Sequence, residues 1–386
     1  MNLIPVMDKK AGKEFLKVAV ELNRKDPNWI RPLDKDIREV FDPSKNKSFR
    51  HGDCQRWILK DDQGHFLGRI AAFTNKHYKN KGTDFAVGGI GFFECVEDQG
   101  AADLMLRTSM EWLKERGMEA MDGPINFGER DRWWGLVVEG FHPPLYCMNY
   151  NPPYYRTLFE NFGFRPYFHQ LCYGMKVTDP VNQKFRERHD RLARDPGYSA
   201  RHIDKKQLDK FIDDFTVIYN KAWAGHGGNK TIERRQAARI FHAMKKVMDE
   251  EIVWYIYYKD EPIGCWLNLP DLNQFFRKLN GKFGIIQKLR FLLMLRKGSR
   301  KFVGLVFGIV PEFQGTGADA YIIIEGAKVI LPAARYEEYE MQWIGDFNPK
   351  MVNIAETLGT RLNRKLTTYR YLFDPQKEFK RHPSLG

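Results

Sequence analysis

Segments rich in β-branched and aromatic residues alternate with helical segments along the whole chain. The predicted strands cover residues 68–73, 87–93, 252–258, 263–267 and 302–310. One helix is predicted over residues 101–116, where Gly117 ends it, and another begins near Asp319. This alternation predicts an α+β fold, a mixed α/β architecture in which sheets are flanked by helices.

The two halves of the chain resemble each other in local sequence. Gln-Gly-Ala-Ala-Asp at 99–103 is similar to Gln-Gly-Thr-Gly-Ala-Asp at 314–319, and each lies between a predicted strand and a predicted helix. A polar and charged stretch separates the halves. We therefore expect two lobes and a linker, at residues 1–178, 201–386 and 179–200.

Composition restricts the class of protein. Apolar residues make up 43% of the 386 residues, which is enough to form cores, and no window approaches about 18 consecutive apolar residues. The first residues lack the apolar segment of a signal peptide, so membrane-spanning and secreted proteins are poor matches. The five cysteines never occur in CxxC spacing, which predicts buried thiols in a cytoplasmic protein and no metal site.

The net charge of +13 favours anionic partners such as phosphates or lipid headgroups. The basic residues are mostly spread along the chain, and no nucleic-acid-binding module is recognisable, so nucleic acid is not the expected partner. One stretch is different. Residues 277–301 combine many large apolar side chains with basic ones, a composition typical of a helix that docks on an anionic membrane or shelters an acyl chain; packing on its own lobe is the alternative.

The segment Val310–Ala318 joins a predicted strand to a predicted helix through two glycines. Glycines let backbone N–H groups approach an oxyanion, and a helix N-terminus adds partial positive charge, so a diphosphate could bind there. No Lys-Ser/Thr pair follows the glycines, which excludes a Walker-type loop, and the dinucleotide-binding GxGxxG is absent. An ordinary strand–helix turn remains the alternative.

The same segment resembles the Q/R-x-x-G-x-G/A pattern of the GCN5-related N-acetyltransferase (GNAT) superfamily, with Gln314 first, Gly317 at the second fixed position and Asp319 in place of the last Gly or Ala. Stretches along nearly the whole chain resemble a bacterial group of two-lobed GNAT proteins, in which some members form ceramides by transferring long acyl chains to lipid amines. They include Asp26–Leu33, Gly68–Ile70, Gly123–Asn126, Val138–Phe141, Asn151–Tyr155 and Leu269–Asn273. The segment Trp343–Asn348 resembles the start of the last strand and helix of the GNAT superfamily.

The resemblance implies two GNAT-like lobes, each a splayed mixed sheet flanked by helices. It also implies an acyl-CoA-dependent N-acyltransferase that acylates a primary amine by direct attack on the thioester, with lipid-like amines among the expected acceptors. Acetyl-CoA or a longer acyl-CoA would lie between the parted strands of the second lobe, beside Ile309, Val310, Gln314, Gly315, Thr316, Gly317, Ala318 and Asn348. The first lobe, with Glu94, Glu97 and Asp98 before its turn, would lack the cofactor and form a wall of the acceptor pocket.

The chemistry needs a base, because an amine with a pKa near 10 must lose a proton before it attacks a thioester. The candidates are Asp346 and His226, with Glu340, Glu129 and Asp131 as alternatives. Many GNAT members place a tyrosine acid in the last helix, but the matching position here is Ala355. Two other functions stay open: an acyl-CoA or ligand-binding protein without turnover, and an aminoacyl-tRNA-dependent transferase.

Overall fold

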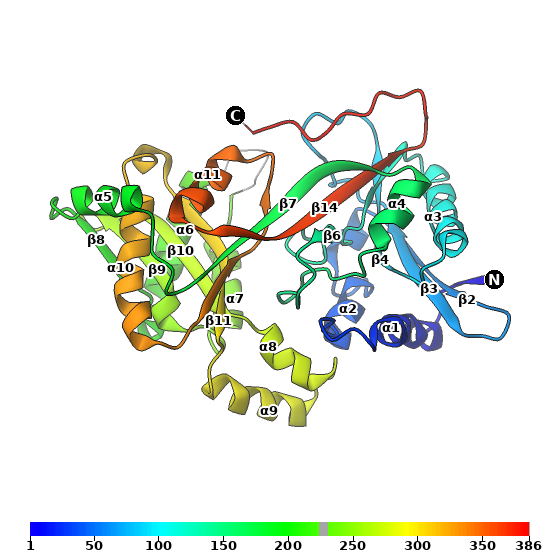
Figure 1. Cartoon of the computed structure of the whole chain (residues 1–386), viewed down its shortest axis with the longest axis horizontal. Helices are drawn as coiled ribbons and strands as arrows, with labels where there is room; N and C mark the ends of the chain where they lie inside the picture. The colour runs from blue at the N-terminus through cyan, green and yellow to red at the C-terminus, as the bar shows by residue number, and fades with distance from the viewer. Residues whose placement is uncertain (224–230, 386) are drawn as a thin grey trace.

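The computed structural model describes residues 1–223 and 231–385. Within this part of the chain, the strands form one continuous mixed sheet with helices on both faces (Figure 1). The strands that precede the middle of the chain are β1 (Asn2–Pro5), β2 (Cys54–Lys60), β3 (Phe66–Phe73), β4 (Val87–Cys95), β5 (Ala120–Gly123), β6 (Leu136–Glu139) and β7 (Arg165–Lys176). Those that follow are β8 (Tyr198–His202), β9 (Val253–Tyr258), β10 (Glu261–Pro270), β11 (Lys301–Ile309), β12 (Glu338–Met341), β13 (Ile344–Gly345) and β14 (Arg361–Leu372).

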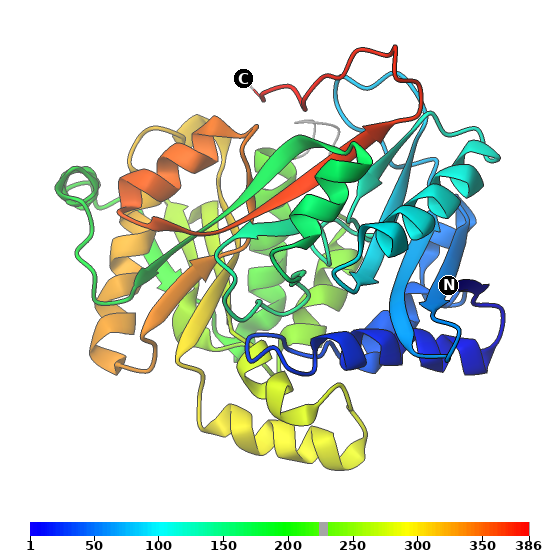
Figure 2. The same ribbon diagram turned by 45° about the vertical axis from the view of Figure 1, so that its right-hand side comes forward.

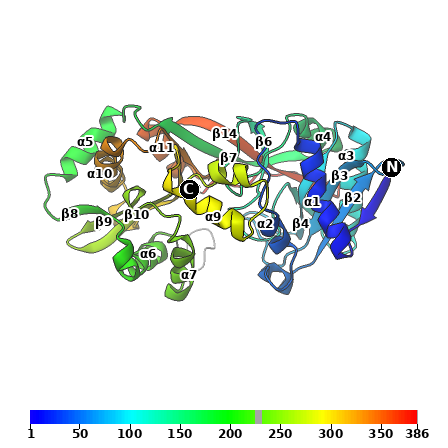
Figure 3. The ribbon, with the colours of Figure 1, turned by 90° about the horizontal axis from the view of Figure 1, so that it is seen from below.

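The helices divide between the two lobes in the same way. The first lobe carries α1 (Lys9–Asn23), α2 (Asp34–Val40), α3 (Gln99–Lys114) and α4 (Tyr155–Phe162). The second lobe carries α5 (Gln183–Leu192), α6 (Leu208–Ala222), α7 (Arg234–Met244), α8 (Asn273–Phe276), α9 (Ile285–Arg296), α10 (Ala318–Ala333) and α11 (Pro349–Leu358). Seen from below, α10 and α5 cover one face of the second-lobe sheet, and α6 and α7 cover the other (Figure 3).

Strand alternation explains why each lobe has two apolar layers. In the first lobe, Ile58 and Ala71 pack with α1, whereas their neighbours Leu59 and Ile70 pack with α3 on the opposite face. Because successive strand residues point to opposite faces, a run of apolar residues buries both. The unbroken apolar runs that predicted these strands therefore match a sheet covered on both sides.

The two lobes exchange their last strands. The strand order is β1-β2-β3-β4-β5-β14-β7-β12-β11-β10-β9-β8, so β14 completes the first-lobe sheet and β7 completes the second-lobe sheet. β7 and β14 run antiparallel beside each other across the middle of the molecule (Figure 1). A buried ion pair joins Arg370 of β14 to Asp122 of β5, with Nε 2.6 Å from Oδ1. The exchange makes the lobes one continuous unit.

The predicted α+β fold class with two splayed, helix-flanked lobes is confirmed. The order strand, glycine turn, helix occurs in both lobes, as β4–α3 and β11–α10. Residues 179–200, expected as a linker, contain α5, whose Phe185, His189 and Leu192 are buried. These three side chains share one helical face, and α5 packs with it against the second lobe.

The basic and apolar stretch 277–301 is helical over only part of its length. Asn280 and Gly281 both have positive φ, 47° and 73°, which ends the turn after α8, and α9 starts only at Ile285. Gly298, at φ 81°, follows the end of α9. The two helices therefore form a short hairpin that projects from the body of the molecule (Figure 2).

Candidate functional site

The parallel strands β11 and β12 pair only at their beginnings. The pairing runs from Lys301↔Glu338 to Gly304↔Met341, and β11 then continues to Ile309 beside β10 alone. Leu305 is exposed and Val306, Phe307 and Gly308 are half-buried, whereas Phe302 and Val303 of the paired part are buried. The second lobe therefore has a splay between its central strands, with the polar backbone of β11 along one side.

Ile309 is the last residue of β11 and Val310 follows it. Their backbone N–H groups point in opposite directions. The Val310 N–H donates to the Ile263 carbonyl of β10, at 2.9 Å. Because N–H groups alternate along a strand, the Ile309 N–H points the other way, toward the splay. Of these two predicted residues, Ile309 is the one whose amide can reach a group lying between the parted strands.

The turn that follows is held by its own side chains. Gln314 Nε2 donates to the Ile309 carbonyl at 3.0 Å, and Thr316 Oγ1 donates to the Phe313 carbonyl at 2.8 Å. Gly315 has φ 75° and lies exposed, and a Cβ built there would meet no described atom within 4 Å. The open side of the turn is therefore at Gly315, where backbone N–H groups are accessible.

Helix α10 begins at Ala318, and among the described residues no side chain caps its N-terminus. An uncapped helix start keeps free N–H groups and partial positive charge. Asp319 lies in this first turn, where its carboxylate would repel an anion, but Arg188 of α5 binds both carboxylate oxygens, at 2.5 and 2.6 Å. Arg191 of α5 also donates to the Thr316 carbonyl at 3.0 Å.

Gly317 has a packing role. Its φ is 110°, and a Cβ there would lie 3.1 Å from the Arg188 carbonyl and 3.2 Å from Leu192 Cδ1. Only glycine therefore allows α5 to come this close to the start of α10. The two glycines of the turn differ, since Gly315 faces open space and Gly317 contacts a helix.

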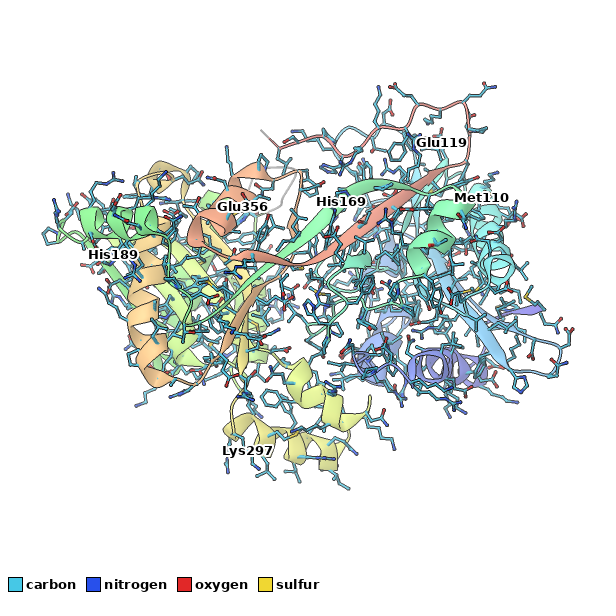
Figure 4. The ribbon with its side chains drawn as sticks, viewed as in Figure 1. Met110, Glu119, His169, His189, Lys297 and Glu356 are labelled. Carbon is cyan, nitrogen blue, oxygen red and sulfur yellow. The ribbon has the colours of Figure 1, made fainter. Side chains whose placement is uncertain are left out.

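The predicted residues beyond the turn have structural partners. The Asn348 side chain accepts from the Met351 N–H at 3.3 Å and caps α11. The Asp346 carboxylate accepts from the His169 backbone N–H at 3.1 Å and from Arg381 Nη2 at 2.6 Å. His169 lies midway along β7, between the lobes (Figure 4).

His226 lies outside the described residues, as do its neighbours Ala224–Lys230. Trp223, which precedes them, packs over Gly308 of β11: a Cβ at Gly308 would lie 2.1 Å from the Trp223 ring. Glu129 and Asp131 are exposed in the segment between β5 and β6. The turn, Asp346 and Asn348 are thus placed by the structure, and His226 stays a prediction.

A buried charged cluster joins side chains of β11, β12 and β14, the last of which lies across β7 from β12. Glu340 is fully buried between Lys301 Nζ, at 3.1 Å, and Arg364 Nε, at 3.5 Å. Arg364 also donates to the carbonyls of His142 and Pro143, both at 2.9 Å. Because Glu340 is held by two cations, it is a structural anion here and a poor candidate for a base.

Asp271, at the end of β10, belongs to the same region. Burial raises the pKa of its carboxyl to about 6, against the opposing effect of a hydrogen bond from the Asn273 N–H. Sequence reasoning did not select Asp271, since a lone aspartate after a strand is ordinarily a surface turn residue.

The matching turn of the first lobe is closed by its own aspartate. Asp98 accepts from the Ala101 N–H at 2.7 Å and caps α3. A carboxylate therefore lies where an anion would bind a free helix N-terminus. Gln99, the counterpart of Gln314, bonds instead to Asp103 and to the Leu158 carbonyl.

A cavity of about 60 Å³ opens beside β4 in the first lobe. Most of its lining residues are apolar, including Ile30, Pro32, Ile37, Trp133 and Met148, and Arg69, Glu94 and Tyr155 supply polar groups. At Phe92, φ is 51° and the β3–β4 register shifts, so β4 bulges at this point. The cavity is far too small for a nucleotide.

Glu94 is the centre of the polar groups at this cavity. Its carboxylate accepts from Asn23 Nδ2 at 2.9 Å, the Tyr155 hydroxyl at 3.1 Å and Arg69 Nη2 at 3.3 Å. Burial, and then the charge of Glu94, raise the pKa of Tyr155 well above its usual range, so the hydroxyl stays protonated. The sequence signal for this site was a charged residue inside each of two apolar strands, Arg69 and Glu94, which pair in register.

Ala355, where many GNAT proteins have tyrosine, is fully buried in α11. It packs in one apolar cluster with Tyr173 of β7, whose hydroxyl donates to Glu356 Oε1 at 3.0 Å. Burial and this hydrogen bond raise the pKa of Tyr173 to about 12. A tyrosine therefore reaches the region of α11 from the exchanged strand, although α11 itself carries none at that position.

No family model matches the chain. The chain is 25% identical over 364 residues to the bacterial ceramide synthase of Caulobacter vibrioides (strain NA1000 / CB15N), covering 93% of this chain and 94% of the relative. It is 24% identical over 373 residues to Protein YghO of Escherichia coli (strain K12), covering 94% of this chain and 93% of the relative.

Solved structures share its architecture. A tandem GNAT protein from the clavulanic acid biosynthesis pathway matches with a TM-score of 0.53 at 10% identity, over 97% of this chain and 99% of that one. A fungal multi-domain β-N-acetylglucosaminidase with a GCN5-related glucosamine N-acetyltransferase region matches with a TM-score of 0.53 at 12% identity, over 96% of this chain. The chain spans only 38% of that larger protein. The fold is thus that of the tandem GNAT proteins, as the sequence patterns predicted.

No helix among the described residues is long and apolar enough to cross a membrane. No group of three or more His, Cys, Asp or Glu side chains among them could hold a metal ion.

Proposed function

We propose that this tandem GNAT-fold chain is an N-acyltransferase that takes its acyl group from acyl-CoA bound to the second lobe. The observation that carries the proposal is the path from the unpaired part of β11 through Gly315 to the uncapped start of α10. A strand with a free edge can hold an extended amide-containing arm, and a free helix N-terminus can hold a diphosphate. Both features occur one after the other along the same path.

The charges around the turn support an anionic ligand. Asp319 is neutralised by Arg188, so its carboxylate no longer opposes a diphosphate at the helix start. In the first lobe, by contrast, Asp98 occupies the corresponding helix start. We therefore assign the acyl-CoA to the second lobe alone.

The proposed reaction is a direct transfer. The amine nitrogen attacks the thioester carbon, the carbon–sulfur bond breaks, the amine gives up a proton, and the sulfur leaves as a thiolate that takes a proton. The Ile309 N–H, which points into the splay, would donate to the oxygen that gains charge during the attack. A thiolate with a pKa of roughly 8.5 is a fair leaving group, so the reaction can proceed without a tyrosine at position 355.

The identity of the group that accepts the amine proton is part of the proposal. His226 and Asp346 are the predicted candidates, and Asp346 is held in this structure by Arg381 and by the backbone of β7. For Asp346 to accept a proton from an amine, Arg381 would have to move away. Substitutions of Asp346 and Arg381 can therefore test whether Asp346, and not His226, is the base.

The proposed acceptor is a long-chain primary amine. A ceramide is an amide of a long-chain amino alcohol, and one relative of nearly equal length is named a bacterial ceramide synthase. The first-lobe cavity next to Glu94 exposes apolar and polar surface in similar amounts, which suits an acceptor that carries both a hydrocarbon part and a polar amine end. The cavity would form one wall of the acceptor pocket.

Calorimetric titration tests the proposal. CoA, acetyl-CoA and palmitoyl-CoA are titrated into the wild type, Gly315→Asp and Gly117→Asp. Both glycines have φ near 75° and open surroundings, so the substitutions carry the same backbone strain but only one places a carboxylate at the turn. We expect about a tenfold or greater loss of affinity for Gly315→Asp only, corresponding to about 1.4 kcal/mol or more.

Thiol release with a panel of short and long-chain amines then separates the alternatives. Turnover with long-chain amines supports the proposed function, whereas tight binding without turnover supports a ligand-binding protein. An absence of acyl-CoA binding by the wild type would contradict both. Retention on tRNA at physiological salt would favour the aminoacyl-tRNA-dependent alternative.

A further inference from the structure

The α8–α9 hairpin is fixed to both lobes. Its inner face packs Phe276 against Phe291, with ring centroids 5.3 Å apart, in a cluster that includes Leu33 of the first lobe. The Asn273 side chain donates to the Pro144 carbonyl at 2.8 Å, and the Asp34 N–H donates to the Gly281 carbonyl at 2.8 Å. The hairpin is therefore a rigid projection that bridges the lobes (Figures 1 and 3).

The outer face of α9 is apolar and exposed. Its large apolar side chains are between 42% and 80% exposed, namely Ile285, Ile286, Leu289, Leu292 and Leu293. At roughly 100° per residue they form one stripe opposite the buried Phe291. A row of such residues on the outside of a rigid hairpin indicates a surface that is covered in use.

Basic side chains lie on both sides of this stripe. At the same helical spacing, Lys288 lies on one side and Arg290 and Lys297 on the other, and all three are exposed. Lys297 follows α9 at the end of the helix that leads to β11 (Figure 4). Long basic side chains beside an apolar stripe can reach phosphate groups while the stripe enters an apolar phase.

The surrounding sequence contains no acidic residue from 272 to 311. The same stretch has nine basic residues: Arg277, Lys278, Lys282, Lys288, Arg290, Arg296, Lys297, Arg300 and Lys301. Asp34, which lies next to Gly281, is already paired with Arg31 and Arg38. Arg300 is paired with Glu337, and Lys301 is paired with Glu338 and Glu340. The other seven basic residues have no acidic partner within ion-pair distance among the described residues, so the hairpin itself presents uncompensated positive charge.

We propose that the outer face of α9 docks on the surface of an anionic lipid bilayer. The apolar stripe would enter the boundary between headgroups and acyl chains, and the flanking basic residues would bind lipid phosphates. At twelve residues, α9 is too short to cross a bilayer and would lie in its plane. The docking rests on this surface alone and does not depend on the proposed function.

A second copy of the chain and nucleic acid fit the outer face of α9 less well than a bilayer does. A second copy meeting through the same face would bring two sets of basic residues together without acidic partners. Nucleic acid would match the charge, but its phosphates would leave five large aliphatic side chains exposed to water. A bilayer with anionic headgroups supplies both an apolar phase and negative charge.

The α8–α9 hairpin directly precedes β11 in the sequence. α9 ends at Arg296, and β11 begins at Lys301, so the docking helix leads directly into the strand with the free edge. Docking would hold the splay of the second lobe near the lipid surface. If the substrates are long-chain, as proposed above, they would then reach the splay of the second lobe without crossing water over a long distance.

Co-sedimentation with vesicles tests the docking. The full chain is mixed with phosphatidylcholine vesicles or with mixed phosphatidylcholine–phosphatidylglycerol vesicles, at rising NaCl concentration. We expect binding to the mixed vesicles that weakens with salt and little binding to phosphatidylcholine alone. Leu289→Asp/Leu293→Asp should abolish binding, and Lys288→Glu/Arg290→Glu should weaken it about tenfold or more.

Matched controls separate docking from general effects. Val217→Asp/Ile240→Asp changes two exposed apolar residues on α6 and α7, and Lys245→Glu/Lys246→Glu reverses two exposed charges just after α7. Both should bind vesicles like the wild type, and circular dichroism should show all variants folded. Equal loss in test and control variants would overturn the proposal.

Three other results would overturn it as well: no binding of the wild type to anionic vesicles, a dimer in gel filtration that Leu289→Asp/Leu293→Asp dissociates, or retention on tRNA that the Leu289→Asp/Leu293→Asp variant keeps while vesicles fail to bind. Soluble acyl-CoA binding by calorimetry is measured on the same samples. Since the docking variants should keep that binding, failure of the docking and failure of the proposed function are distinguishable.

Discussion

Arg188 of α5 and Asp319 of α10 form an ion pair at the start of α10, with one guanidinium nitrogen 2.5 and 2.6 Å from the two carboxylate oxygens. The Asp319 side chain is only 9% exposed, so the pair is largely shielded from water. Asp319 replaces the small residue of the GNAT pattern, and Arg188 compensates for its charge. A helix from the expected linker thus restores the electrostatics of the turn.

Removing Arg188 should therefore weaken acyl-CoA binding. In Arg188→Gln, the Asp319 carboxylate is left unpaired near the helix start and repels a diphosphate, so we expect about a tenfold loss of affinity by calorimetry. Adding Asp319→Asn to this variant should restore most of the affinity. If the double variant binds as weakly as Arg188→Gln, the pair does not act through the charge of Asp319.

The two glycines of the turn should respond differently to alanine. Gly317→Ala brings a Cβ within 3.1 Å of the Arg188 carbonyl at φ 110°, so we expect a loss of about 2 kcal/mol in the free energy of unfolding. Gly315→Ala adds a Cβ into open space at φ 75° and should cost only about 1 kcal/mol. Urea unfolding compares them, and equal losses would contradict the assigned packing of α5.

Asp271 should make the stability of the chain depend on pH. Burial raises the pKa of its carboxyl from its usual 3.8 to about 6, so the folded state binds this proton more tightly than the unfolded state. The contribution is fully favourable below pH 4 and is lost as the pH rises to about 6. Above that pH the ionised carboxylate costs about 3 kcal/mol, since each pKa unit corresponds to about 1.4 kcal/mol.

Asp271→Asn removes this titration while its amide oxygen can still accept from the Asn273 N–H. We expect the variant to be more stable than the wild type at pH 7.5, with the difference shrinking as the pH falls through 6 toward 4. Thermal unfolding at several pH values measures the difference. A variant that is less stable than the wild type at pH 7.5 would show that Lys301 and Arg364 need the ionised carboxylate.

The buried pair of Arg69 and Glu94 should be costly to break on one side only. Their side chains are 6% and 10% exposed, so Glu94→Leu leaves a buried guanidinium without its anion, at a cost of about 3–5 kcal/mol in unfolding free energy. Arg69→Met/Glu94→Leu should recover most of this stability. A double variant as unstable as the single one would mean that Asn23 and Tyr155 need the carboxylate more than Arg69 does.

Asp346 can be tested against its partner Arg381. If Asp346 only fastens the C-terminal segment, Asp346→Asn and Arg381→Gln should lower stability by a similar amount, about 1 kcal/mol, and leave the pH profile of amine acylation unchanged. If Asp346 is the base, only Asp346→Asn should lower kcat, by about a hundredfold or more, with the loss persisting across pH. Initial rates from pH 6 to 9 distinguish the two roles.

Much of the second-lobe site follows from local sequence, because β11, the turn and α10 are consecutive. Gln314 and Gly317, the first two fixed positions of the pattern, lie in the turn between β11 and α10. The partner of Asp319 could not be predicted, since Arg188 is 131 residues away and lies in a polar segment that indicates a linker. The helix of that segment depends on three buried residues within a highly charged sequence.

The exchange of β7 and β14 between the lobes could not be predicted from the sequence either. Both strands are long and complete a sheet beside a short antiparallel neighbour, β5 for β14 and β12 for β7, so their sequences fit either lobe. Arg370 and Asp122, 248 residues apart, form the pair that links β14 to the first lobe, and no local pattern connects them. The Arg69–Glu94 site is intermediate, because its two charges stand out in apolar strands although their function does not.

A crystal structure of the full chain with a non-hydrolysable thioether analogue of palmitoyl-CoA tests the central assignment most directly. We expect the diphosphate within hydrogen-bonding distance of the Gly315 and Thr316 amides, and the pantetheine arm along β11 between Gly304 and Ile309. Diphosphate bound at the first lobe, or a splay filled by side chains with the ligand elsewhere, would contradict the account.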